Sequence, residues 1–183
     1  MKILKIKKPK LLLHICCAPC GAYVTNLLNL DYEVVLYFFN SNIFPENEHD
    51  TRLIEVKRIA KEFGLKLIIG DYNHSSWLEK ITGKENEPEK GSRCRICYWE
   101  RLENTALTAQ KQKIDIFAST LSVSPHKDAV AINIIGKDLE EKYGVQFLDK
   151  DFKKQDGYKK SLELSKKYNF YRQNYCGCEF SRR

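Results

Sequence analysis

Seven cysteines in three tight groups are the feature that most constrains how this chain can fold. They stand at Cys16-Cys17-Ala18-Pro19-Cys20, at Cys94-Arg95-Ile96-Cys97 and at Cys176-Gly177-Cys178, and no cysteine lies outside these groups. A disulfide framework would spread its cysteines among distant loops, whereas a metal or redox centre needs several thiolates at one point. The fold is therefore expected to bring three distant segments together around a sulfur-lined centre.

The length and composition are those of an ordinary soluble globular domain. We expect a single domain over residues 1–183, which is long enough to bury a core without the help of disulfides. The apolar stretch Leu11–Leu13 is too short for a secretory signal, and no apolar run reaches transmembrane length. A reducing cytoplasm is therefore expected, where clustered cysteines act as metal ligands or redox-active thiols.

The net charge of +7 is concentrated at the two ends of the chain. Residues 1–13 contain five lysines and no acidic residue, and the C-terminal segment 152–183 contains nine lysines and arginines against three acidic residues. Two basic ends favour a polyanionic partner such as a nucleic acid, although a solvated, lysine-rich surface carries the same charges. The segment 152–183 also carries the third cysteine group.

Strand and helix patterns alternate along the chain. Apolar runs predict strands at 11–15, 33–39, 66–70, 115–120 and 145–148. Helical spacing predicts helices at 21–30, 46–63, 75–82, 94–111, 127–143 and 157–168. Ser92 is expected to cap the fourth helix, and Val130, Ile134 and Leu139 are expected to face inward from the fifth. The polar stretch 83–92 predicts a loop.

This alternation predicts an α/β fold, a parallel sheet with helices on both faces. In such sheets, functional sites form outside the carboxyl ends of the strands. Cys16 directly follows the first predicted strand, and residues 40–43, 71–72 and 121–124 follow the next three. Cys94 and Cys97 begin a helix, and helix starts face the same edge. The cysteines are thus expected to meet there.

Four of the cysteines form a plausible ligand set. Cys94 and Cys97 are spaced so that they share one face of a helical turn, and Cys16 and Cys17 add two more thiolates. Four thiolates suit either zinc or an iron–sulfur cluster. Structural zinc sites usually bring paired C-x-x-C motifs, so the adjacent pair Cys16-Cys17 favours iron–sulfur.

The remaining cysteines leave alternatives open. A disulfide between Cys176 and Cys178 would close a small strained ring around Gly177, and strained disulfides are the labile, catalytic ones. The two thiols could equally be further ligands of the same centre. Cys20 is either a third local ligand or, as we prefer, a buried thiol that packs like a small apolar residue.

The cysteines and their surroundings together resemble the epoxyqueuosine reductase QueH family. The similar stretches are HICCAPCG at 14–21, YFFNSNIFPENEHDTR at 37–52, RCRICYWERLENTA at 93–106, TLSVSPHKD at 120–128 and YRQNYCGC at 171–178. They span nearly the whole chain in order. Two positions depart from the family pattern: His49 replaces an aromatic residue, and His126-Lys127 replaces a Tyr-Gln pair. Both changes are expected to alter substrate contacts without touching the cysteine set.

The resemblance implies the reduction of epoxyqueuosine in the anticodon loop of tRNA to queuosine. It implies a [4Fe–4S] cluster at Cys16, Cys17, Cys94 and Cys97 and a redox pair at Cys176 and Cys178. It also implies an external electron donor, compatibility with an additional mononuclear iron, and a three-layer nucleotide-binding fold of the HUP or PP-loop kind. Because HICCAPCG stands where PP-loop ATPases carry a Ser-Gly-Gly loop, we expect no use of ATP. The lack of an apolar run of transmembrane length predicts no membrane partner.

Removal of the epoxide oxygen needs a proton donor, and the tRNA needs phosphate contacts. His14, Asp71, His126 and Asp128 are candidate acids at strand ends or loops, of which His126 and Asp128 lie in a stretch that resembles the family. Arg172, Arg182 and Arg183 flank the Cys176–Cys178 pair and are the predicted phosphate contacts. Two other functions are weighed against this one: a non-catalytic zinc module that binds RNA, and a thiol–disulfide oxidoreductase.

Overall fold

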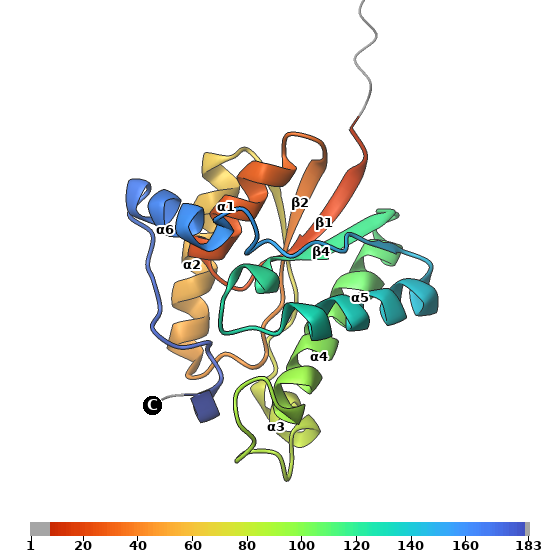
Figure 1. Ribbon diagram of the computed structural model, residues 1–183, viewed down its shortest axis with the longest axis vertical. Coiled ribbons are helices and arrows are strands. Elements are labelled where there is room, and N and C mark those ends of the chain that lie inside the picture. Colours follow the sequence, from red (N-terminus) through yellow and green to blue (C-terminus); the bar gives the residue numbers. More distant parts are fainter. Residues whose placement is uncertain (1–7, 182–183) are drawn as a thin grey trace, which may run out of the picture.

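A five-stranded parallel sheet forms the centre of the computed structural model, which describes residues 8–181 (Figure 1). Its strands are β1 (Lys10–His14), β2 (Glu33–Phe38), β3 (Lys66–Ile69), β4 (Ile116–Ser119) and β5 (Gln146–Phe147), arranged in the order β3-β2-β1-β4-β5. All four pairings are parallel. The predicted parallel sheet is confirmed.

Helices cover both faces of the sheet. Buried side chains of α1 (Ala18–Leu28) and α2 (Glu46–Glu62) pack on one face, where α6 (Gly157–Lys167) also lies. Those of α4 (Ser92–Lys111) and α5 (Ala129–Tyr143) pack on the other. Leu11 and Leu13 of β1 face the first layer and Leu12 faces the second, as expected for a strand buried on both sides. The predicted three-layer α/β fold is confirmed.

The strand order places a topological switch beside β1. The chain moves from β1 to β2 and β3 on one side, and then returns to β4 on the other side of β1. The connections after β1 and β4 therefore diverge, which opens a crevice at their carboxyl ends. Residues of both connections line the main cavity of the described molecule, including Cys16 after β1 and Thr120 after β4.

The inward face of α5 was predicted wrongly. Val130 is 69% exposed and Ile134 is 58% exposed, whereas Leu139 is buried as expected. The buried face instead carries Ala131 and Gly136 among its residues. An added Cβ at Gly136 would lie 2.3 Å from the ring of Phe147, so small residues allow this face to approach β5 closely.

Smaller elements complete the carboxyl edge of the sheet. A short helix α3 (His74–Lys80) follows β3, a 3-10 turn η1 (Thr120–Val123) follows β4, and a second turn η2 (Glu179–Ser181) ends the described chain. The predicted cap at Ser92 is wrong: Gly91 occupies the N-cap position, and Ser92 is the first residue of α4. Within residues 8–181, no helix has the length and apolarity needed to cross a membrane.

Candidate sulfur-lined active site

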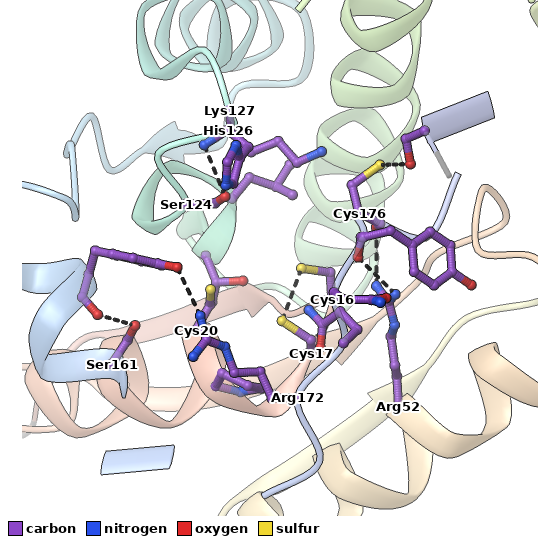
Figure 2. A pocket seen from close by; sticks show the side chains of 18 of the residues that line it. Cys16, Cys17, Cys20, Arg52, Ser124, His126, Lys127, Ser161, Arg172 and Cys176 are labelled. Carbon is purple, nitrogen blue, oxygen red and sulfur yellow. Dashed lines mark hydrogen bonds between the residues drawn. The ribbon is translucent and has the colours of Figure 1, made fainter. Parts of the chain in front are cut away.

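A cavity of about 750 Å³ lies at the carboxyl ends of β1 and β4 (Figure 2). Its walls come from the start of α1, from α2 and α4, from the loop before α5, from α6 and from the C-terminal segment. Three of the four cysteines on its surface lie together at the start of α1, and the fourth belongs to the C-terminal segment; they are Cys16, Cys17, Cys20 and Cys176. Two of the three cysteine groups therefore line one cavity.

The first group is placed by the turn from β1 into α1. Cys17 has extended backbone at the N-cap position, and Pro19 fits the first turn of the helix because it needs no hydrogen-bond donor there. The Sγ atoms of Cys16 and Cys17 are 3.8 Å apart. Cys20, one turn later, is only partly buried: it packs against the core and also lines the cavity. Cys20 is therefore more accessible than a packed core thiol.

The second group lies in the first turn of α4. The backbone N–H of Lys90 donates to Sγ of Cys94 at 3.3 Å. Cys97 is buried together with Trp77 and Cys178, so the second and third cysteine groups meet in one small cluster. This first turn contains no acidic residue, and the positive end of the helix dipole is therefore available to thiolates.

The third group is folded into a tight turn. Gly177 has a φ of +106°, which a residue with a side chain rarely adopts, and its carbonyl accepts the N–H of Phe44 at 2.9 Å. The Sγ of Cys176 lies 3.0 Å from Oγ of Ser181, and that hydroxyl donates to the carbonyl of Cys178 at 2.7 Å. All of the cysteines are free thiols.

Arg52 on α2 holds the C-terminal segment against the cavity. Its side chain is only 1% exposed, and its Nε donates to Glu48 at 2.7 Å. Its Nη1 donates to the carbonyl of Cys176 at 3.1 Å, and its Nη2 donates to that of Tyr175 at 3.3 Å. Glu48 also accepts the hydroxyl of Tyr171 at 2.8 Å. One buried ion pair thus fixes the backbone on which Cys176 stands.

Most of the buried thiols resist ionisation. The hydrogen bond with Cys17, followed by burial, raises the pKa of Cys16 well above its usual value. The hydrogen bond from Cys16 lowers the pKa of Cys17. A hydrogen bond with Cys20 and burial raise it by more, so that the pKa of Cys17 is about 11. Burial raises the pKa of Cys97 to about 12, and it also raises that of Cys178. Binding of a metal by these thiols must therefore displace their protons.

Cys176 differs from those four thiols. Burial opposes its ionisation, but the charge of Lys127, hydrogen bonds with Ser181 and with the backbone of Cys178, and the charge of Arg101 outweigh burial and lower its pKa. Lys127 lines the cavity, and Figure 2 shows its amine extending toward the side that holds Cys176. Lys127 therefore does act on the cysteine set, contrary to the expectation from the sequence.

The surroundings of the thiols fit an anionic group. Arg101 is 2% exposed, lines the cavity, and its charge acts on Cys97, Cys16 and Cys176. None of the ion pairs between residues 8–181 includes Arg101 or Lys127. The Nε of Arg101 is buried without a hydrogen-bond partner. Unpaired positive charge and an orphan donor beside thiols match what a thiolate-bound cluster needs.

The four thiols of the proposed ligand set are not arranged around a single point in this structure. Within the described part of the chain, no three His, Cys, Asp or Glu side chains are arranged so that they could hold one metal ion. Arg101 lies near both thiol pairs, since its charge acts on Cys16 and on Cys97. The donor chemistry and the location fit a cluster, and cluster binding would have to draw the two pairs together.

His14 has a structural role instead of the acidic role considered from the sequence. It is fully buried, with Nδ1 3.0 Å from Oγ of Ser119 and Nε2 3.1 Å from the carbonyl of Phe39. Because that carbonyl only accepts, Nε2 carries the proton and Nδ1 accepts from Ser119. Neutral His14 thus ties together the ends of β1, β2 and β4.

Acid is expected to destabilise the protein through His14. Burial, aided by the charge of Arg101, lowers its folded-state pKa from 6.5 to about 3. The unfolded chain therefore binds this proton more readily, and the stability is present above about pH 6.5 and is lost as the pH falls toward 3, by about 5 kcal/mol in all. Urea unfolding from pH 7 to pH 4 should show a flatter pH dependence for His14→Asn; equal slopes would contradict this role.

Of the other predicted proton donors and phosphate contacts, some line the cavity and some do not. His126 lines the cavity, whereas Asp128 does not: its carboxylate accepts the N–H of Ala131 at 3.1 Å and caps α5. Asp71 is exposed and is not part of the cavity wall. Arg172 lines the cavity. Arg182 and Arg183 lie outside the described residues.

His49, the other departure from the family pattern, is a packing residue. Its ring is buried, 5.1 Å from the ring of Phe38 and 4.1 Å from that of Tyr72. It is absent from the cavity wall. The imidazole therefore occupies the place of an aromatic ring in the core, and the expectation that His49 contacts substrate is not supported by its position.

The sequence reasoning missed Arg52, Arg101, Lys127 and Ser181. A signal existed for Arg101, which stands four residues after Cys97 and therefore on the same face of the helix. Arg52 ends one of the stretches that carry the family resemblance. The contacts of Arg52 with residues 175 and 176 join positions more than 120 residues apart, which local patterns do not reveal.

Comparisons with known proteins give matches along nearly the whole chain. The family described as Epoxyqueuosine reductase QueH matches residues 11–183. Proteins of that name from Haemophilus influenzae and Streptococcus pyogenes are 42% and 39% identical to this chain, each over 95% of it and over 72% and 71% of their own lengths. That of Thermotoga maritima is 38% identical over 93% of this chain and 88% of its own.

Solved structures with low sequence identity share the fold. The U34-tRNA thiolase NcsA from Methanococcus maripaludis, solved with its [4Fe–4S] cluster, superposes with a TM-score of 0.60 over 100% of this chain and 64% of its own, at 15% identity. A predicted tRNA methyltransferase subunit from Methanocaldococcus jannaschii gives the same TM-score and identity over 86% of this chain and 74% of its own. The match along residues 11–183 and the close relatives settle the assignment, and the chain belongs to the epoxyqueuosine reductase QueH family.

Proposed function

We propose that this protein reduces epoxyqueuosine in tRNA to queuosine with a [4Fe–4S] cluster held by Cys16, Cys17, Cys94 and Cys97. The observation that supports this proposal is that the first and third cysteine groups line one cavity together with Arg101, while Cys97 of the second group packs against Cys178 of the third. Buried, unpaired positive charge favours thiolates and a cluster, and it disfavours a site built to hold a bare cation.

The reaction sets the electron count. Conversion of an epoxide to an alkene releases the oxygen as water and takes up two electrons and two protons. A bound cluster would supply one-electron transfer from an external donor. The thiols of Cys176 and Cys178 can hold two electrons between them, because their oxidation to a disulfide releases two electrons and two protons. The additional mononuclear iron remains a prediction, for which Cys20 is the cavity thiol left unassigned.

The remaining cavity residues suit a tRNA base. Three tyrosines, Tyr158, Tyr171 and Tyr175, line the cavity and can stack on an extruded base. We propose that the proton donor comes from the corner where His126 and Lys127 lie, since Asp128 is engaged as a helix cap. We propose no use of ATP, because Cys16–Cys20 fills the turn after β1, and we place the reaction in the cytoplasm.

Arg172 is expected to contact a phosphate of the tRNA. It lines the cavity, its Nη2 donates to the hydroxyl of Tyr158 at 3.0 Å, and its side chain is exposed. Arg172→Met should weaken binding of substrate tRNA and reduce the slope of log affinity against log salt by about 1. Filter binding over a range of salt concentrations measures both. An unchanged slope would remove Arg172 from the interface.

Cys176→Ala tests the division of labour among the cysteines. The variant is expected to keep its iron, sulfide and visible absorption, because Cys176 is outside the proposed ligand set, but to lose at least about 10³-fold in turnover. Anaerobic iron and sulfide analysis and nucleoside analysis of the tRNA give the two readouts. Loss of the cluster would reassign Cys176 as a ligand, and full turnover would exclude it from catalysis.

A further inference from the structure

The two thiols of the Cys176–Cys178 pair face different surroundings. Cys176 is partly exposed and lines the cavity. Cys178 is buried and packs with Trp77 and Cys97, behind the cavity wall. A substrate in the cavity can therefore reach Cys176 but not Cys178.

Cys176 also has a cationic neighbour in the cavity. Lys127 lines the cavity, and its amine extends toward the side that holds Cys176 (Figure 2). Its charge acts on Cys176, and no carboxylate among residues 8–181 forms an ion pair with it. A thiol and an ammonium group that face one cavity form a nucleophile and an acid within reach of the same substrate.

The backbone holds the two thiols in a fixed relation. Arg52 binds the carbonyls of Tyr175 and Cys176, and Phe44 binds that of Gly177. The positive φ of Gly177 turns the chain so that the cysteines on either side are neighbours across one residue. A second thiol is thus held behind the first, on the side away from the substrate.

We infer that Cys176 is the nucleophile that opens the oxirane ring, that Lys127 protonates the released oxygen, and that Cys178 resolves the resulting thioether. This inference rests on the proposed function, because it takes epoxyqueuosine in tRNA as the substrate. It assigns the proton transfer to Lys127, which was not among the four candidates from the sequence; one of those candidates, the neighbouring His126, is exposed.

The steps balance. The Sγ of Cys176 bonds to one oxirane carbon as the C–O bond breaks, and the oxygen takes from Lys127 the proton that Cys176 has released. The Sγ of Cys178 then bonds to Sγ of Cys176, the C–S electron pair forms the C=C bond, and the hydroxyl leaves as water with the proton of Cys178. The epoxide is reduced and the two thiols are oxidised to a disulfide. Two electrons from the external one-electron donor and two protons restore the thiols.

Cys178→Ser provides the test, because it removes the resolving thiol. The cluster-containing variant, mixed with tRNA that carries epoxyqueuosine, is expected to accumulate a covalent protein–tRNA species on denaturing gels. Peptide mass spectrometry should place the modification on Cys176. Cys176→Ser should form no such species, and tRNA that already carries queuosine should give none with either variant, because it has no oxirane.

Lys127 is tested in the same background. Lys127→Met combined with Cys178→Ser should form the covalent species at least about 10²-fold more slowly, as expected for loss of a general acid. Lys137→Met is the matched control, since Lys137 lies on the exposed side of α5 and, among residues 8–181, forms an ion pair with Glu140 alone. An equal rate for the Lys127 and Lys137 variants would overturn the role of Lys127.

Failure of this inference is distinguishable from failure of the proposed function. If wild type produces queuosine while Cys178→Ser forms no adduct, the covalent route is wrong, but the proposed reductase function is retained. If cluster-containing wild type with an electron donor leaves epoxyqueuosine unchanged, the proposed function falls.

Alkylation of wild type gives a measurement that needs no variant. Cys176 should react with the alkylating reagent before Cys178, and substrate tRNA should protect Cys176. The reverse order of reaction would overturn the assignment.

Discussion

Replacement of Cys94 by alanine is expected to remove both the iron–sulfur cluster and the activity. Cys94 lies in the first turn of α4, beside the positive end of the helix dipole, and is one of four proposed ligands. Loss of one thiolate from a four-thiolate site removes the charge and the bond that hold the cluster against solvent and oxygen. Anaerobic iron and sulfide content, visible absorption and queuosine formation should all fall to background.

The fold of the Cys94 variant serves as its control. Cys94 is only partly buried, and alanine is a good helix former, so far-UV circular dichroism should match that of wild type. A folded Cys94→Ala protein that keeps its iron, sulfide and turnover would exclude Cys94 from the ligand set. A variant that loses turnover but keeps the cluster would move Cys94 from cluster binding to another role.

Replacement of Arg52 by methionine is expected to have the second largest effect. The change leaves the mostly buried Glu48 without its cation and frees the carbonyls of residues 175 and 176. Removal of one partner of a buried ion pair costs about 3–5 kcal/mol. Urea unfolding should show a loss of that order. Because Cys176 loses its backbone anchor, queuosine formation should fall and Cys176 should alkylate faster.

Arg58→Met is the matched control for Arg52. Arg58 lies on the same helix and pairs with Glu55 at 2.8 Å, but its side chain is 48% exposed. Glu55 is as buried as Glu48, but about half of the Arg58 side chain is in water, so the control should lose less stability than Arg52→Met and should keep its activity. If the two variants lose equal stability, or if Arg52→Met keeps full turnover, Arg52 does not anchor the Cys176 turn.

The sheet was predictable because its signals are local. Strands buried on both faces appear as short apolar runs, and each predicted run became a strand within a few residues of its expected bounds. Gly64 and Gly144 directly follow the predicted helices 46–63 and 127–143, and both adopt positive φ there. Once the strands are parallel, the carboxyl edge gathers the first two cysteine groups with no further information.

The contacts inside the site were less predictable because they join distant positions. Lys127 reads as an exposed charge at the start of a helix, yet the cavity places it opposite the Cys176 turn. The face of α5 was misjudged because large apolar residues suggested the buried side, whereas close packing against Phe147 selects small ones. Which side chains share a cavity depends on the packing of helices, which apolar spacing alone does not fix.

Anaerobic determination of iron, acid-labile sulfide and zinc in the purified wild-type protein tests the central claim most directly. A cluster held by Cys16, Cys17, Cys94 and Cys97 predicts about four irons and about four sulfides per chain, with an electron paramagnetic resonance signal after reduction. Stoichiometric zinc without sulfide, in a colourless protein, would contradict it.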